Sequence, residues 1–137
     1  MKKPTRCIKF YSNQLSQINY KHSYFRFYAL RNRGILYFYE KVYQKAIDDF
    51  TSAIDVSDPE MIYRFYWNPP ELKLNKIRSR VFFYRGIAYI EKQILDKAID
   101  DLSKSLELYP KIIDENKSKF KILPLEIKRL IKIFFEI

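Results

Sequence analysis

The chain contains an internal repeat, and this feature restricts its fold more than any other. Residues 33–37 (RGILY) recur as residues 85–89 (RGIAY), and residues 45–50 (KAIDDF) recur as residues 97–102 (KAIDDL). Both matches have the same offset of 52 residues. A constant offset across two separate blocks indicates a duplicated supersecondary unit.

Each copy shows the apolar spacing of two successive helices. In the first copy, one helix ends near Glu40 and a second covers about residues 43–56. Apolar and small residues of the second helix share one face. In the first copy these are Ala46, Ile47, Phe50, Ala53 and Ile54, and in the second they are Ala98, Ile99, Leu102, Ser105 and Leu106. The repeat unit is therefore predicted to be a helical hairpin.

Two glycines suggest close packing within each hairpin. Gly34 and Gly86 are the only glycines, and each lies inside a predicted helix. Glycine there is less favourable than alanine by about 1 kcal/mol. A helix tolerates this cost where two backbones approach closely, so we expect Ala46 to face Gly34 and Ala98 to face Gly86.

The unit resembles the tetratricopeptide repeat, a helix-turn-helix of about 34 residues. The first helix of that family carries a large apolar residue, then Gly, then Tyr, and its second helix carries a small, a large and a small residue. The matching residues are Leu30, Gly34, Tyr37, Ala46, Phe50 and Ala53 in the first copy, and Phe82, Gly86, Tyr89, Ala98, Leu102 and Ser105 in the second. Pro110 ends the second unit as expected, and Pro59 falls one residue late. The resemblance implies an all-α fold in which two hairpins form a right-handed superhelical stack.

The resemblance divides the chain into a basic N-terminal extension (1–21) and one helical domain (22–137). The domain comprises repeats 27–60 and 79–112, an insert 61–78 and C-terminal capping helices 113–137. We expect a first helix over about 24–41, capped by Ser23, and a long helix over 69–91, started by a capping box of Asn68 and Glu71. Residues 57–67 are predicted to form a loop or short turn. A disordered linker is the alternative, but the aromatic residues of the insert disfavour it.

The flanking segments should complete the stack, because repeat arrays normally need about three units. Residues 126–137 form an amphipathic pattern that we interpret as a capping helix; a dimer contact, insertion into a larger assembly and a membrane-surface helix are alternatives. Residues 12–20 predict a weak helix. The acid-free N-terminus either packs on the first repeat or stays loose, and a targeting peptide is the less favoured interpretation. No transmembrane segment or secretion signal is predicted, which leaves a cytoplasmic or organellar location.

Charge alternates along the chain, whose net charge is +10. The first helix of each hairpin is basic and the second is acidic. In the family that the unit resembles, first helices line the concave groove, which would therefore be basic and aromatic. Its expected residues are Tyr28, Arg31, Asn32, Ile35, Tyr39, Arg80, Phe83, Tyr84 and Ile87. These residues favour an acidic peptide or a larger protein assembly as partner; solvated faces and core aromatics are the alternative.

The known clamp for terminal carboxylates in this family is not indicated, because Ile35 and Tyr84 replace its asparagines. RNA association is a second possibility, since a basic chain with interleaved aromatics suits phosphates and bases. No catalytic site, metal site or cofactor is predicted: His22 and Cys7 are single residues of their type. The repeated pairs Asp48-Asp49 and Asp100-Asp101 are expected to face outward.

Overall fold

The structure, a computed structural model, describes residues 3–17, 23–62 and 69–135. Every regular element in these ranges is a helix, which confirms the all-α prediction. The elements are α1 (Lys3–Gln17), α2 (Ser23–Tyr39), α3 (Tyr43–Val56), α4 (Pro59–Ile62), α5 (Glu71–Glu91), α6 (Leu95–Leu108), α7 (Ile112–Glu115), α8 (Lys117–Lys121) and α9 (Leu125–Phe135).

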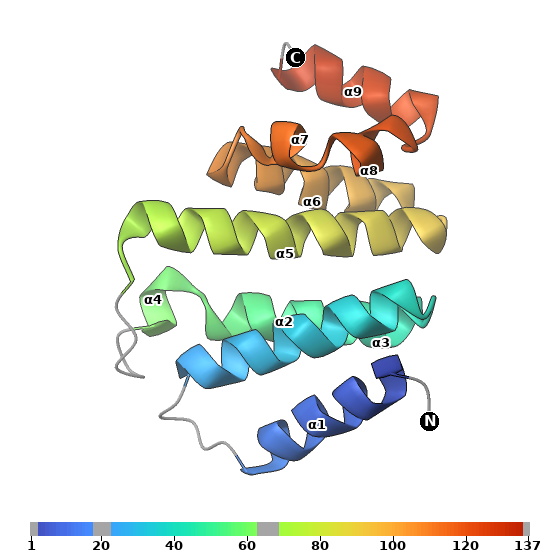
Figure 1. Cartoon of the computed structure of the whole chain (residues 1–137). Coiled ribbons are helices and arrows are strands. Elements are labelled where there is room, and N and C mark those ends of the chain that lie inside the picture. Colours follow the sequence, from blue (N-terminus) through green and yellow to red (C-terminus); the bar gives the residue numbers. More distant parts are fainter. Residues whose placement is uncertain (1–2, 18–22, 63–68, 136–137) are drawn as a thin grey trace.

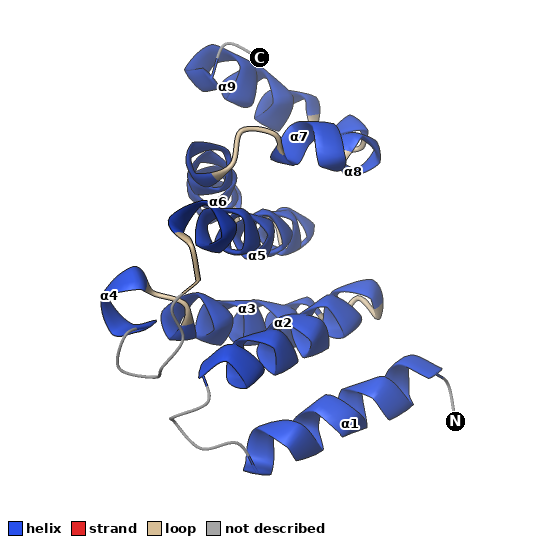
Figure 2. Cartoon of the chain, turned by 60° about the vertical axis from the view of Figure 1, so that its left-hand side comes forward, coloured by secondary structure: helices blue, strands red, loops and turns tan. Residues whose placement is uncertain are grey.

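The helices form a stack that follows the order of the chain (Figure 1). Helices α2 and α3 form one packed hairpin, and α5 and α6 form another. Of the first hairpin, α5 contacts mainly α3, so that the second hairpin sits on the first. Helix α1 packs against α2 at one end, and α7 to α9 cover the other end (Figure 2).

Both hairpins turn in the same way. Lys41 and Gln93 are equivalent residues, and both adopt a positive φ, 62° and 61°. Val42 N–H then donates to the Tyr37 carbonyl, and Ile94 N–H donates to the Tyr89 carbonyl, both at 2.9 Å. A left-handed residue after the last turn satisfies carbonyls that a helix end leaves open. The two turns therefore share one geometry.

The predicted boundaries hold well for the repeat helices. Helix α3 covers the predicted 43–56, and α5 ends at Glu91 as predicted. Helix α5 begins at Glu71 with Pro70 as its N-terminal cap residue, so Glu71 cannot be the fourth residue of a capping box begun by Asn68. Asn68 itself lies outside the described residues. Helix α9 ends at Phe135, within the predicted 126–137.

The N-terminal prediction was wrong in extent. The helix begins at Lys3, not near Ser12, and the predicted part beyond Gln17 lies outside the described residues. Half-buried Ile8, Tyr11 and Leu15 recur at helical spacing and explain the longer helix. Leu15 packs against the core that α2, α3 and α5 share. Within residues 57–67, where a loop or short turn was predicted, α4 supplies one helical turn, and residues 63–67 lie outside the described residues.

The glycines lie within helices as predicted, but their closest neighbours differ from the predicted alanines. A Cβ on Gly34 would lie 2.7 Å from Phe50 Cε1, and one on Gly86 would lie 3.1 Å from Leu102 Cγ. The closest approach is therefore one turn beyond Ala46 and Ala98. Both alanines are instead fully buried in the core.

Two apolar cores run through the stack. The first joins α2, α3 and α5 around Phe27, Phe50 and Val81. The second joins α5 to α6, α7 and α9 around Phe83, Leu102 and Ile127. Half-buried Phe38 contacts both, so the hairpins are held together by continuous packing.

Candidate functional site

A pocket of about 420 Å³ lies where α2, α5 and the α7–α8 segment meet. We call it the arginine pocket. Its lining comes from three parts of the stack, and five of the nine predicted groove residues are among them. The lining residues are Arg31, Ile35, Arg80, Phe83, Tyr84, Glu115 and Asn116. The pocket thus combines two guanidinium groups with two aromatic rings and one carboxylate.

The other four predicted residues lie outside the pocket lining. The guanidinium of Arg31 lies 4.5 Å above the ring of Tyr28. Asn32 Nδ2 donates to the Tyr11 hydroxyl of α1 at 3.2 Å, so Asn32 joins α2 to the N-terminal helix. Tyr39 is exposed near the end of α2, and Ile87 is buried in the second core. Phe83 is also fully buried, so it contributes to the pocket only as part of its floor.

Arg31 carries a charge that no carboxylate balances within the described part of the chain. Its Nε and Nη2 donate to Asn32 Oδ1 at 3.1 and 2.9 Å, a neutral acceptor. Burial lowers the pKa of Arg31, and the positive charge of Arg80 lowers it further, against the effect of Tyr28. An anion placed in the pocket would offset both effects.

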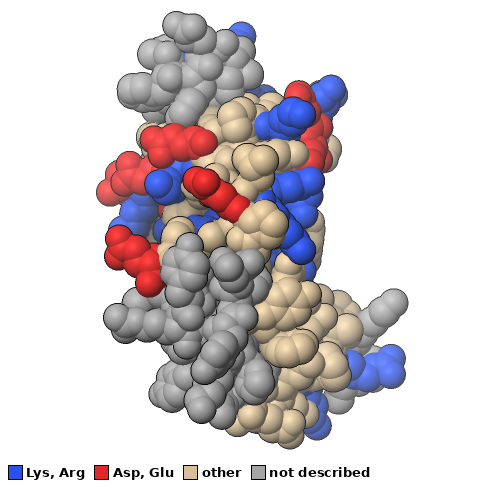
Figure 3. All heavy atoms as spheres, turned by 90° about the vertical axis from the view of Figure 1, so that its left-hand side faces the viewer, with Lys and Arg blue, Asp and Glu red and all other residues tan. Residues whose placement is uncertain are grey.

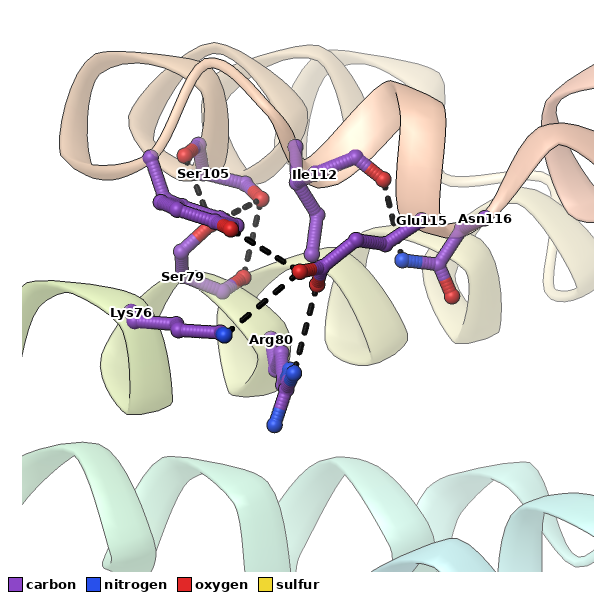
Figure 4. Close-up of polar contacts among 8 residues, drawn as sticks. Lys76, Ser79, Arg80, Ser105, Ile112, Glu115 and Asn116 are labelled. Atoms are coloured by element: carbon purple, nitrogen blue, oxygen red, sulfur yellow. Dashed lines mark hydrogen bonds and ion pairs between the residues drawn. The ribbon is translucent and has the colours of Figure 1, made fainter. Parts of the chain in front are cut away.

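Among the described residues that line the pocket, Glu115 is the one acidic group, and it comes from α7 (Figure 4). Its Oε2 lies 3.2 Å from Arg80 Nη2, and its Oε1 lies 3.5 Å from Lys76 Nζ. The Tyr109 hydroxyl donates to Oε1 at 2.8 Å. The hydrogen bond from the Tyr109 hydroxyl lowers the pKa of Glu115 most. The hydrogen bond from Arg80 and the positive charges of Lys76 and Arg80 lower it further. The carboxylate of Glu115 itself thus occupies one side of the pocket.

A second polar cluster joins α2, α5 and α8 beside the pocket. Lys119 Nζ donates to the Tyr84 hydroxyl and lies 4.1 Å from the centre of that ring and 5.8 Å from that of Tyr39. Burial alone would lower the pKa of Lys119, but hydrogen bonds with the two tyrosines raise it overall. Lys119 therefore stays charged next to the two rings.

The sequence did not identify Glu115 or Lys119 as site residues. Both lie in the segment after the second repeat, which carries no repeated pattern. The only signal was the position of one Glu in a lysine-rich stretch. Their role depends on contacts between that segment and α5, and no local sequence pattern predicts those contacts.

The outward orientation predicted for the paired aspartates was wrong for one member of each pair. Asp49 and Asp101 are buried, whereas Asp48 and Asp100 are exposed. Arg33 Nη2 lies 2.7 Å from Asp49 Oδ1, and Arg85 Nη2 lies 2.7 Å from Asp101 Oδ1, each with a second hydrogen bond from Nε at 2.8 Å. All four residues recur at the offset of 52, which was the available signal. The pairs join the two helices of each hairpin.

These pairs leave Arg33 and Arg85 satisfied by carboxylates. Burial would lower the pKa of Arg85, but the hydrogen bonds and charge of Asp101 raise it overall. The hydrogen bond with Asp49 raises the pKa of Arg33. Both arginines therefore serve the fold. Arg31 pairs with no carboxylate of the described residues, and Arg80 shares Glu115 with Lys76.

The side view of the surface shows an uneven distribution of charge (Figure 3). Most acidic groups gather along one edge, and the opposite edge carries mainly basic groups.

Within the described ranges, no helix has the length and apolar character needed to cross a membrane, and no cluster of His, Cys, Asp and Glu could hold a metal ion. Comparisons with protein families, with curated proteins and with solved structures gave no match to this chain.

Proposed function

We propose that this protein is a scaffold of the tetratricopeptide-repeat type that binds an acidic segment of a partner protein in the arginine pocket. The proposal joins the repeated Gly-Tyr and Ala-Phe pattern of the sequence with the packed hairpins of the structure. A pocket between the first helices of two hairpins suits a segment of partner chain that crosses the stack. The partner is either a transient ligand or a neighbouring subunit of a larger complex.

The observation that carries the proposal is the unbalanced charge of Arg31. Its guanidinium is half-buried, lies on an aromatic ring and faces a second arginine, Arg80, across the pocket. A carboxylate that accepts hydrogen bonds from these groups would make charge-assisted contacts, each worth about 1.5–3 kcal/mol. Tyr84 and Ile35 add apolar surface beside the charge, which favours a side chain or backbone over a free anion.

Charge reversal at the two arginines tests the proposal. The probe is a labelled glutamate-rich peptide that also contains leucine and tyrosine, and the same peptide with lysine in place of glutamate is its control. Arg31→Glu with Arg80→Glu should weaken binding of the acidic peptide at low salt by about a hundredfold, from the loss of two charged contacts. The matched control is Lys9→Glu with Lys73→Glu, which makes the same change of net charge at exposed positions. Equal binding by the arginine variant and this control would remove the proposal.

A competition experiment separates the proposal from RNA association, the alternative that the composition raises. A single-stranded oligonucleotide should not displace the acidic peptide at moderate salt, because Arg33 and Arg85 are committed to ion pairs. Displacement with a steep loss of affinity between low and moderate salt would instead indicate phosphate binding.

Co-purification distinguishes a structural subunit from an adaptor. A partner protein that co-purifies in a fixed ratio resistant to salt would identify a structural subunit, and a partner that salt removes would identify an adaptor.

A further inference from the structure

The last part of the stack has a second groove, distinct from the arginine pocket. It lies between the α7–α8 segment and α9 and has a volume of about 530 Å³. Its apolar surface comes from Ile113, Phe120 and Leu125. The other described residues of its lining are all basic: Lys117, Lys121, Lys128, Arg129 and Lys132. We call this surface the end groove.

The end groove exists because the last helices are splayed. Helices α2 and α3 lie in close contact, as do α5 and α6, whereas α8 and α9 have little close backbone contact (Figures 1 and 2). Their apolar side chains therefore remain accessible where a tighter hairpin would bury them. Leu125 is 60% exposed, and the neighbouring Ile122 is 78% exposed.

The stack itself shows what kind of element covers such a surface. Helix α5 lies against the α2–α3 hairpin and buries its apolar face there, through Leu74, Ile77 and Val81. The α7–α9 segment presents an uncovered apolar surface between two helical segments at the next level of the stack. A helix has a diameter of about 10 Å with its side chains and fits between diverging helices.

The rim charge selects the kind of helix. Lys117, Lys121, Arg129 and Lys132 form no ion pair with any residue that the structure describes. Lys128 Nζ donates to the backbone carbonyl of Lys121, which leaves its charge unbalanced as well. A second copy of the same face would meet this rim with like charge, which is unfavourable. An acidic rim on the partner would be complementary.

We infer that the end groove binds an amphipathic helix of a partner protein, with an apolar stripe flanked by glutamate or aspartate. The helix would lie between α8 and α9 and add one layer to the stack. The apolar stripe would cover Phe120 and Leu125, and the acidic flanks would meet the lysines and Arg129. This site does not depend on the arginine pocket, because the two share no lining residue.

Binding of a designed helical peptide tests the inference. The probe is a labelled, side-chain-stapled peptide with leucines on one face and glutamates beside them, and its control carries lysine for glutamate. The full chain should bind the acidic peptide at least about tenfold more tightly than the basic one, since the rim charges attract the first and repel the second. Amide chemical-shift changes should concentrate in residues 113–132. Equal binding of the two peptides, or no binding of either, would overturn the inference.

Three variants locate the site. Lys117→Glu with Arg129→Glu should weaken the acidic peptide by about tenfold or more, because two attractions become repulsions. Leu125→Ser should weaken both peptides severalfold without a change of charge. Lys9→Glu with Lys73→Glu, the control for net charge, should leave binding within twofold. A loss that is equal in the rim variant and in the Lys9/Lys73 control would show only general attraction to a basic protein, and would overturn the inference.

Two further results would replace a partner helix with another occupant. Vesicles of phosphatidylglycerol and phosphatidylcholine that bind more tightly than the peptide, with the same dependence on Lys117, Leu125 and Arg129, would assign the groove to a membrane surface. Concentration-dependent dimerisation that Leu125→Ser abolishes would assign it to a second copy of the chain. Circular dichroism on every variant checks that the helices are intact.

Discussion

Gly34 and Gly86 occupy equivalent places, but their neighbours differ in size. The ring of Phe50 lies against Gly34, and the smaller side chain of Leu102 lies against Gly86. Both neighbours are buried in the core, at 0% and 1% exposure. The same substitution should therefore have unequal effects at the two positions, although both lie in the middle of a helix.

Gly34→Ala should lower the free energy of unfolding by about 1–2 kcal/mol. The new Cβ would lie 2.7 Å from a ring that cannot move freely, and the cost of overpacking outweighs the gain of about 1 kcal/mol in helix propensity. Gly86→Ala should change stability much less, because its closest contact is 3.1 Å. Urea denaturation followed by circular dichroism measures both.

Phe50→Leu supplies the control for this prediction, because it gives the first hairpin the residue of the second. In the Phe50→Leu background, Gly34→Ala should cost less than in the original chain. An equal cost in both backgrounds would show that the ring is not what limits the position.

Glu115 occupies the side of the arginine pocket where an acidic ligand would bind. Glu115→Gln should raise the affinity for the glutamate-rich peptide severalfold, because Arg80 and Lys76 lose their internal carboxylate while the side chain keeps its size. Titration of the labelled peptide measures the change. Asp114→Asn is the matched control, since Asp114 is exposed, lies next to Glu115 and carries the same charge. A decrease of affinity in Glu115→Gln would show that the carboxylate instead helps to shape the pocket.

At the scale of the elements, one ion pair joins the helices of each hairpin. The side chain of Asp101 is only 6% exposed, and Arg85 Nη1 also donates to Thr51 Oγ1 of α3 at 3.1 Å. Arg85 therefore links α5 to the helix after it and to the hairpin below it. Arg33 has the same arrangement, with Asp49 of α3 on one side and Ser12 Oγ of α1 at 3.2 Å on the other.

Asp101→Ala should reduce the free energy of unfolding by about 3 kcal/mol, because it leaves the charge of Arg85 largely buried without its partner. The double variant Arg85→Met with Asp101→Leu should be clearly more stable than Asp101→Ala, since it removes both charges. Asp100→Ala, at the exposed neighbour, should stay within about 0.5 kcal/mol. Chemical denaturation of the original chain and the three variants measures these differences. A double variant as unstable as Asp101→Ala would mean that lost packing, not the unpaired charge, causes the loss of stability.

The elements differ in how far their sequence determines them. The limits of α3 and the end of α5 were predictable, because apolar spacing and turn residues act locally. Helix α1 was predicted too short, since its half-buried residues gain a clear role only against α2. The prediction that Asp49 faces outward was wrong because it considered only the apolar spacing of α3. The position of the Asp49 carboxylate depends on Arg33 of the facing helix α2. Glu115 was missed for the same reason, since its partners lie far back in the chain on α5.

At the scale of the whole molecule, α1 lies against α2 in the way that α3, the second helix of the first hairpin, lies against α5. Ser12 of α1 contacts Arg33 of α2 as Thr51 of α3 contacts Arg85 of α5. The N-terminal segment thus packs below the first hairpin as the first hairpin packs below the second. Each layer contacts mainly the layer next to it, which is the arrangement of a quasi-one-dimensional repeat protein.

A stack with contacts between neighbouring layers should transmit damage over a short range. Leu15→Ala weakens the packing of α1 on the first core, and Ile127→Ala weakens the packing of α9 on the second core. We expect Leu15→Ala to speed amide hydrogen exchange in α1 and α2 and to leave α6 and α9 unchanged. Ile127→Ala should do the reverse, with faster exchange in α6 to α9 and unchanged protection in α1 and α2. Peptide-resolved hydrogen exchange under native conditions distinguishes this from a uniform increase in either variant, which would mean that the two cores, joined through Phe38, unfold as one unit.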